Sequence, residues 1–391
     1  MTDQEIKDLA AKQLEWAVAL RRRLHRVPEP GNQEFETQKI ITEALDELSI
    51  EYTTENTWTV GLIRGAYPGE TVAYRADIDA LPVEEPEGCP FRSTHPGMMH
   101  ACGHDAHTAI LLGAAAILNG MKDQLHGNVK LLFQPAEETD GGAERMVKAG
   151  VMENPHVDHV YGLHVMPRLP LGTVETRRGT LNASTDGITL VVHGLSGHGA
   201  YPESGRDAIV CAAEIITALQ TLVSRNLSPL SSAVLSIGTI EGGRASNIIC
   251  DEVTMKGTLR TANAEIRAMM KQRITEVAQG VAQAMGCTAD VRIQPGYNAL
   301  VNDLTEAERV HQVGARLFGA DHMLEKAEPS MGAEDFSFFS DEAPGAFYHI
   351  GCVREDELPA PPLHSCDFHI DERCMAVGMA MHIAMALEFL K

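Results

Sequence analysis

The stretch "HACGHDAHTAILLGAAAILNGM" (residues 100–121) joins a polar segment directly to an apolar one. Three histidines, a cysteine and an aspartate occupy residues 100–107, and the residues from His107 onward have the composition of a buried helix. The apolar part is too short to cross a bilayer, which needs about 20 apolar residues. We therefore expect a core helix that follows a loop rich in metal-binding side chains, with residues 100–107 on that loop.

Strand-like runs lie on both sides of this stretch. Residues 71–79 ("TVAYRADID"), 127–134 ("GNVKLLFQ") and 159–165 ("HVYGLHV") are short and apolar, and helical patterns separate them. Strands that alternate with helices favour a largely parallel sheet covered on both faces. The sequence therefore predicts an α/β fold for this part of the chain.

Polar residues close each of these predicted strands. Asp77 and Asp79 end the first, Glu137 and Glu138 follow the second, and His164 lies near the end of the third. Ligands of open α/β sheets bind at the carboxyl ends of the strands. We expect these side chains and the loop at residues 100–107 to meet at one rim of the sheet.

The pattern changes after residue 181. Residues 182–296 are arranged as strand, helix, strand, strand, helix, strand, which is a split unit able to fold by itself. A chain of 391 residues is also long enough for two domains. We predict an α/β protein of two domains, a mostly parallel-sheet domain built from residues 1–181 and 297–391 and an inserted ferredoxin-like (βαββαβ) domain at 182–296.

The overall charge limits the class of partner. The chain has 32 basic and 54 acidic residues, a net charge of -22, which opposes binding to nucleic acid or anionic membranes. Eight cysteines lack the spacing of a disulfide framework, and the N-terminal residues do not resemble a secretory signal. We expect a cytoplasmic protein with reduced thiols that acts on a small molecule.

The residue types at the predicted rim suit a metal ion. A thiolate, imidazoles and a carboxylate are ligands for zinc, manganese, cobalt or nickel. Of two adjacent glutamates, one can bind metal while the other faces a water molecule as general base. A second carboxylate, Asp79, would orient a ligating imidazole. The candidate ligands are Cys102, His104, Glu138, His164 and His364, and the remaining glutamate, Glu137, is the candidate base.

Each motif also has a structural interpretation when taken alone. The Cys-Gly-His segment can cap a helix, the glutamate pair can be a solvated turn, and a histidine among apolar neighbours can be a satisfied core residue. Only their joint occurrence favours metal binding. The chain has no phosphate-binding loop, dinucleotide fingerprint or HExxH helix, so nucleotide-binding and zincin functions lack their motifs.

The motifs resemble those of the metal-dependent aminoacylase/carboxypeptidase family, peptidase family M20, in its Cys-containing amidohydrolase branch. The segments "GMMHACGHDAHTAILLGAA" (97–115), "FQPAEET" (133–139), "GAEDFSFF" (332–339) and "LHSCDFHIDE" (363–372) carry the likeness, in the family's order and spacing. The branch includes N-acyl-amino-acid amidohydrolases, hippurate hydrolases, auxin-conjugate hydrolases and aminobenzoyl-glutamate hydrolases.

The resemblance implies a metallohydrolase catalytic domain at residues 1–181 and 297–391, a lid domain at 182–296, and roles for individual residues. The branch's metal ligands fall on the five candidates named above, which would hold one or two divalent ions, and its base falls on Glu137. By position, His198 would stabilise the oxyanion and Asn247 would bind substrate, both from the lid, which often forms a homodimer in this family. The lid motif "GHGAYPESGRDA" (197–208) departs from the family pattern at Gly199 and at Glu203, where a second histidine is common.

The predicted function is hydrolysis of the amide bond of N-acyl amino acids by metal-activated water with a glutamate base. A dipeptidase or carboxypeptidase of the same family is the alternative within that chemistry. Two alternatives come from other classes. One is a metal-independent thiol hydrolase with Cys102 as nucleophile and a nearby histidine as base, and the other is a non-catalytic metal-binding protein on a hydrolase scaffold.

Overall fold

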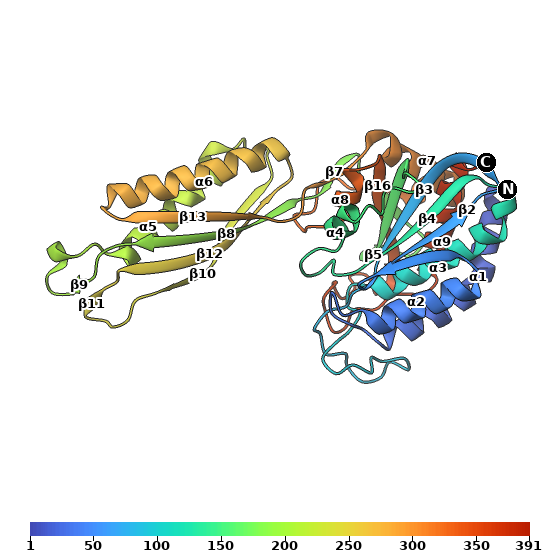
Figure 1. Ribbon diagram of the computed structural model, residues 1–391, viewed down its shortest axis with the longest axis horizontal. Helices are drawn as coiled ribbons and strands as arrows, with labels where there is room; N and C mark the ends of the chain where they lie inside the picture. The colour runs from blue at the N-terminus through green and yellow to red at the C-terminus, as the bar shows by residue number, and fades with distance from the viewer. The chain divides into compact units, whose positions relative to one another are not determined.

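The computed structural model describes all 391 residues, which form two compact units (Figure 1). The first unit comprises Met1–Leu181, Val301–Glu328 and Asp335–Lys391, and the second comprises Asn182–Leu300 and Pro329–Glu334. The second unit therefore extends a few residues beyond the predicted end at residue 296. It also takes in a short later segment, because the backbone N–H of Ala183 donates to the carbonyl of Ser330 at 2.9 Å.

An eight-stranded mixed sheet forms the centre of the first unit, in the order β1-β2-β4-β3-β5-β16-β6-β15. Its middle strands β4, β3, β5 and β16 pair in parallel, as the alternation of strands and helices predicts. The strands are β1 (Glu51–Glu55), β2 (Trp58–Arg64), β3 (Tyr67–Asp77), β4 (His126–Gln134), β5 (His159–Pro170), β6 (Val174–Thr176), β15 (Met323–Glu325) and β16 (Gly345–Val353).

Helices cover this sheet. Every residue of β16 is buried, and so are the last seven residues of β3, which requires cover on both faces. Helices α1, α3 and α9 pack against one another, and α3 and α9 also pack against β3 (Figure 1). The helices of this unit are α1 (Asp3–His25), α2 (Phe35–Glu47), α3 (His104–Gly120), α4 (Ala143–Lys148), α7 (Leu304–Phe318), α8 (Ser337–Ser340) and α9 (Cys374–Phe389).

Helix α3 begins earlier than the sequence pattern predicts. His104 to His107 form the first turn of this helix. The expectation that residues 100–107 all lie on a loop is therefore wrong for residues 104–107. The cause is Gly103, whose φ of 87° turns the chain into the helix at that point. A side chain is rarely tolerated in this left-handed conformation.

The second unit has the predicted βαββαβ order. Its four strands form an antiparallel sheet, β10-β12-β8-β13, and helices α5 and α6 pack together and supply apolar side chains to a core of their own. A further pair of two-residue strands, β9 (Gly197–His198) and β11 (Ile248–Ile249), was not predicted. The main elements are β8 (Ser184–His193), α5 (Ala208–Thr221), β10 (Ala233–Gly242), β12 (Glu252–Thr261), α6 (Ala264–Ala284) and β13 (Thr288–Pro295).

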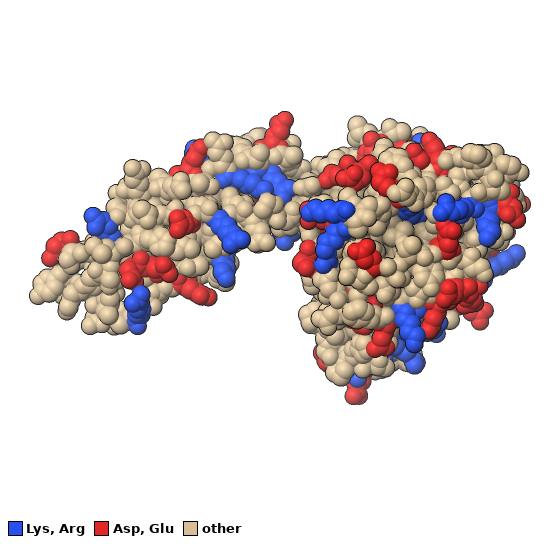
Figure 2. Space-filling view, in the orientation of Figure 1, with Lys and Arg blue, Asp and Glu red and all other residues tan.

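Helix α5 and the turn after it are strongly apolar. The segment Ala208–Asn226 is long and apolar enough to cross a membrane by length and composition. One side of it is packed into the core of the second unit through Cys211, Ile215 and Leu219. Of this apolar stretch 33% is buried, and Ile209 and Val210 are exposed. For the protein as a whole, Figure 2 shows acidic and basic side chains interspersed on one face.

Candidate metal centre and active site

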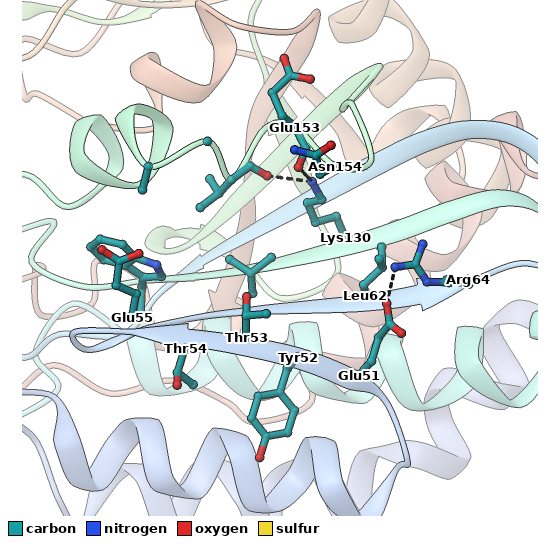
Figure 3. A pocket seen from close by; sticks show the side chains of 15 residues that line it. Glu51, Tyr52, Thr53, Thr54, Glu55, Leu62, Arg64, Lys130, Glu153 and Asn154 are labelled. Carbon is teal, nitrogen blue, oxygen red and sulfur yellow. Dashed lines mark hydrogen bonds and ion pairs between the residues drawn. The ribbon is translucent and has the colours of Figure 1, made fainter.

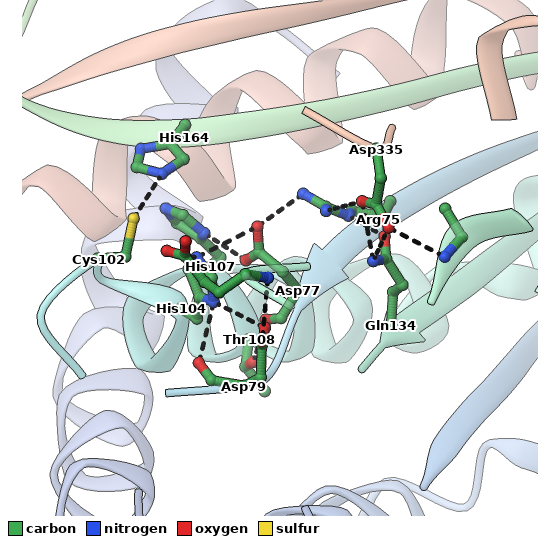
Figure 4. A network of polar contacts seen from close by, with 12 residues as sticks. Arg75, Asp77, Asp79, Cys102, His104, His107, Thr108, Gln134, His164 and Asp335 are labelled. Carbon is green, nitrogen blue, oxygen red and sulfur yellow. Dashed lines mark hydrogen bonds and ion pairs between the residues drawn. The ribbon is translucent and has the colours of Figure 1, made fainter. Parts of the chain in front are cut away.

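The parallel strands bring the predicted polar residues to one edge of the sheet. Strands β3 and β4 run in parallel with Asp77 opposite Gln134, so the residues that follow both strands leave the sheet together. These are Asp79 after β3 and the pair Glu137 and Glu138 after β4. Strand β5, parallel to β3 on its other side, carries His164. Figure 4 shows several of these side chains converging.

Cys102 and His104 reach the same place from the start of helix α3. Between them Gly103 lies so close to β5 that a Cβ atom there would collide with the side chain of Val165. This close approach leaves the Cys102 sulfur 3.3 Å from Nε2 of His164. Glycine is thus required at residue 103 both by its backbone conformation and by its neighbour.

Asp79 orients His104. The Nδ1 atom of His104 lies 2.9 Å from the carbonyl oxygen of Asp79 and 3.2 Å from its carboxylate, so Nδ1 carries the proton. The opposite nitrogen, Nε2, is buried and has no hydrogen-bond partner. Once deprotonated, this nitrogen can offer its lone pair to a metal ion.

The glutamate pair follows a strained turn. Ala136 has a φ of 57°, a conformation that non-glycine residues adopt rarely, and its N–H donates to buried Glu34 at 2.9 Å. Both glutamates that follow are half-buried, and Glu138 donates its own backbone N–H to Asp79 at 3.0 Å. Asp79 therefore fixes the glutamate turn as well as His104.

His364 joins from a loop distant in sequence. It also has a positive φ, 64°, and its backbone N–H donates to the carbonyl of Ala101 at 2.8 Å, next to Cys102. Its Nε2 atom lies 3.0 Å from Oε1 of Glu138. This side chain is half-exposed, unlike the other three nitrogen and sulfur donors.

All six residues predicted as ligands or base are brought together. In each of three overlapping groups, the potential ligand atoms lie within 4.8 Å of one another. A site with one sulfur, several nitrogens and two carboxylates fits a divalent transition metal or zinc. The groups are Cys102, His104 and His164; Cys102, Glu138 and His364; and His104, Glu137 and Glu138.

In the absence of a bound metal ion, burial and neighbouring charged groups set the protonation states of these side chains. Burial raises the pKa of the Cys102 thiol well above its ordinary value, and the neighbouring Glu138 adds to this. Burial also lowers the pKa of His164 well below its ordinary value. For His104, burial opposes the charged form, but Asp77 and Asp79 outweigh it and raise the pKa to about 10. A divalent cation would displace the protons of the thiol and the imidazoles as it binds.

Two residues with supporting roles, His107 and Arg75, were missed at the sequence level. His107 lies 2.6 Å from Asp77 through Nδ1 and accepts the N–H of Val165 at Nε2, so both nitrogens are used and it holds β5 in place. Arg75 donates to Asp77, Gln134 and Asp335, all buried (Figure 4). The sequence signal for this buried network was a charged residue, Arg75, inside an apolar strand and two residues before Asp77.

The two predicted lid residues lie in the second unit. The short strands β9 and β11 pair Ile248 with His198, and the N–H of Gly199 donates to the carbonyl of Asn247 at 2.8 Å. A Cβ atom on Gly199 would lie 3.0 Å from that same carbonyl oxygen, which explains why glycine suits this departure from the family pattern. The catalytic roles of His198 and Asn247 stay predictions.

Comparison with known proteins decides the family. The model of peptidase family M20/M25/M40 matches residues 73–388, which include every candidate ligand. This chain belongs to that family. The resemblance read from the sequence is thereby confirmed, and with it the class of enzyme, a hydrolase.

Relatives of this M20 chain are similar over nearly its full length. N-acetyldiaminopimelate deacetylase of Bacillus velezensis is 40% identical, covering 93% of this chain and 95% of the relative. Thermostable carboxypeptidase 1 of Saccharolobus solfataricus is 37% identical, covering 96% and 95%. The crystal structure of the Bacillus subtilis YXEP protein, described as a dinuclear metal binding peptidase from the M20 family, is 34% identical with a TM-score of 0.85, covering 97% and 98%.

A pocket of this M20 hydrolase lies apart from the metal-binding residues. It has a volume of about 490 Å³ and runs along β1 and β2, with Glu51, Trp58, Arg64 and Lys130 among its walls (Figure 3). The Lys130 ammonium donates to three backbone carbonyls, and Arg64 pairs with Glu51 at 2.7 Å. Lys130, Arg64 and Glu51 are thus paired within the structure, and none of the proposed metal ligands lines this pocket.

Proposed function

We propose that this protein is a metal-dependent amidohydrolase that releases amino acids from N-acyl amino acids. The observation that carries the proposal is the Nε2 atom of His104, which has no hydrogen-bond partner and lies among a thiol, imidazoles and carboxylates whose ligand atoms are within 4.8 Å of one another. Relatives named as deacetylases of N-acetyl amino acids support the substrate class.

Five residues would hold the cofactor, one or two divalent ions. Such an ion supplies a Lewis acid that polarises the amide carbonyl and lowers the pKa of water toward about 7. The relative described as dinuclear supports two ions, and the mixed sulfur, nitrogen and oxygen donors support zinc, manganese, cobalt or nickel. The ligands proposed are Cys102, His104, Glu138, His164 and His364.

Glu137 is proposed as the general base. It accepts a proton from the attacking water and delivers it to the nitrogen of the leaving amine, while the hydroxyl group adds to the carbonyl carbon and the C–N bond breaks. The products are a carboxylate and a free amino acid. His198 is proposed to donate a hydrogen bond to the oxyanion, and Asn247 to contact the substrate.

A carboxypeptidase or dipeptidase activity is the second candidate. It is favoured by the similarity to two thermostable carboxypeptidases of Saccharolobus solfataricus, and it uses the same residues in the same roles. The two activities differ only in whether the acyl group on the cleaved nitrogen belongs to an amino acid.

A thiol hydrolase is disfavoured by electrostatics. Cys102 and His164 are close enough to form a nucleophile and base pair, at 3.3 Å. However, burial raises the pKa of the Cys102 thiol and lowers the pKa of the His164 imidazole, so both are neutral rather than a thiolate and an imidazolium. In an active thiol hydrolase the pKa of the cysteine is lowered, so that the thiolate forms beside a protonated imidazole.

We also propose a cytoplasmic homodimer assembled through the second unit. Strand β10 lies at an edge of its sheet and exposes Val234 and Ile240, and the nearby Leu230 is 95% exposed. An apolar edge of this kind is suited to pair with a second copy. Light scattering on the purified chain tests this proposal, because a homodimer has twice the mass of a single chain.

The test of the function is release of free amino acid from a panel of acetyl, benzoyl and indole-acetyl amino acids, aminobenzoyl-glutamate and dipeptides. Chelated enzyme should release none, and restoring one of manganese, cobalt, nickel or zinc should recover release. Activity that survives chelation but not thiol alkylation would support the thiol hydrolase instead. Bound metal with no release from any compound would support a non-catalytic protein.

A further inference from the structure

A second group of metal-binding side chains lies in the first unit, outside the centre described above. His25, at the end of α1, meets Glu85 and Cys89 from the loop between β3 and α3. One potential ligand atom from each lies within 4.8 Å of the other two. None of these residues belongs to the proposed catalytic set.

His25 is oriented in the way that metal-binding histidines are. Its Nδ1 atom lies 2.8 Å from the carboxylate of Asp105, which also accepts from Nε of Arg21 at 2.8 Å. Its Nε2 atom is thereby directed at Oε1 of Glu85, 3.2 Å away. A carboxylate behind one imidazole nitrogen fixes the ring and strengthens the opposite nitrogen as a ligand.

Glu85 is held by a similar supporting contact. One of its oxygens, Oε2, accepts the backbone N–H of Ser93 at 2.6 Å, which leaves Oε1 facing His25. The thiol of Cys89 lies within 4.8 Å of a carboxylate oxygen of Glu85. Both His25 and Glu85 are buried, whereas Cys89 is partly exposed.

The group opens into a pocket of about 260 Å³. Cys366 and His369 also line this pocket, so two further soft donors are available there. The nearby cationic side chains do not oppose a metal ion, because Arg21 and Arg22 both pair with Glu372, and Arg21 also pairs with Asp105.

We propose that His25, Glu85 and Cys89 bind a zinc-class divalent ion at a site separate from the catalytic centre. Tetrahedral zinc, with bonds of about 2.0–2.3 Å, places its ligand atoms roughly 3–4 Å apart, which the group satisfies with small adjustments. Binding releases the thiol proton of Cys89 and any proton shared by His25 and Glu85. Cys366 and His369, which line the same pocket, are the candidates for the fourth ligand.

The site would act as a structural clamp. Glu85 and Cys89 lie on the loop that leads into the Cys102 segment, and Cys366 follows His364 by two residues. An ion at this site would therefore fasten α1 and two loops that carry catalytic ligands. Structural zinc sites contribute directly to folding stability.

Metal content and a spectroscopic signature test this proposal independently of hydrolysis. The Cys89→Ser variant, equilibrated in a zinc buffer and analysed by mass spectrometry of the metal, should hold one zinc ion per subunit fewer than the parent chain and keep its amidohydrolase activity. Cys250→Ser is the matched control. Its thiol donates to the carbonyl of Glu252 at 3.0 Å in the second unit, a bond that serine can keep, so its zinc content should not change.

Cobalt distinguishes the two sites. The Cys102→Ser variant lacks the thiol ligand of the proposed catalytic centre. In this background, cobalt should still give a thiolate charge-transfer band in the near ultraviolet. Adding Cys89→Ser should abolish that band. If Cys89→Ser does not fold, Glu85→Gln serves in the same measurements. Equal zinc content in the parent chain and the variants, with no cobalt band in the Cys102→Ser background, would overturn the proposal even if catalysis is metal-dependent.

Discussion

Asp79 fixes His104 through two contacts, since Nδ1 of the imidazole lies 2.9 Å from its carbonyl oxygen and 3.2 Å from its carboxylate. The second carboxylate oxygen accepts the N–H of Glu138 at 3.0 Å. One buried side chain thus sets the positions of two proposed metal ligands from different elements, α3 and the turn after β4. Its importance can be tested without changing either ligand.

Asp79→Asn should weaken metal binding about 10- to 100-fold, the usual effect of removing a carboxylate that orients a metal ligand. The amide cannot accept from both His104 and Glu138, because only one of its two polar atoms is an acceptor. Competition with a metal-sensitive dye measures the affinity. Asp341→Asn, a change at an exposed residue distant from the site in sequence, is the control; equal affinities for the two variants would contradict the role given to Asp79.

Gly103→Ala should destabilise the protein by roughly 1–3 kcal/mol, because it strains a positive φ and drives a methyl group against Val165. Chemical denaturation measures the free energy of unfolding. The matched control is Gly120→Ala at the end of the same helix, where an added Cβ meets nothing within 4 Å. A loss of stability at Gly120 equal to that at Gly103 would show that the contact with Val165 has no special cost.

The buried carboxylate of Glu306 should make stability depend on pH. Burial alone would raise its pKa, but contacts with His159, Tyr161 and Arg309 outweigh burial and lower the pKa to about 2. Because the folded pKa lies below the unfolded value of 4.5, the carboxylate stabilises the fold fully above that pH, and this contribution is lost as pH falls toward 2.

Glu306→Gln should therefore lower the free energy of unfolding at neutral pH by about 1–3 kcal/mol, and the difference from the parent chain should shrink as the pH is lowered below 4.5. Denaturation curves at pH values from 7 to 3 measure it, with Glu328→Gln, at an exposed position, as the control. A difference that grows as the pH falls would show that the sign of this linkage is wrong.

Sequence patterns were sufficient for the overall architecture. Apolar runs alternating with helices gave the parallel core strands, and the strand and helix order of residues 182–296 gave the second unit, because both rest on local hydrophobic periodicity. The convergence of polar residues followed from a general property of parallel sheets, whose strands end at a common edge.

Details that depend on contacts across the fold were not accessible. The start of α3 at His104 depends on the φ of Gly103 and on Val165, which lies on another element. His107 belongs to the same polar segment as His104, yet its nitrogens contact Asp77 and Val165, and no local pattern separates the two histidines. Arg75 and Asp335 are 260 residues apart, so their pairing has no local signal.

The most direct test of the central claim compares Glu137→Gln with Glu138→Gln, measuring bound metal and amino acid release on the same samples. Glu137→Gln should keep its metal and lose at least about 100-fold in turnover, because a general base typically contributes 10²–10⁴-fold. Glu138→Gln should lose metal and turnover together. If Glu137→Gln hydrolyses N-acyl amino acids at the rate of the parent chain with its metal in place, the proposed mechanism is contradicted.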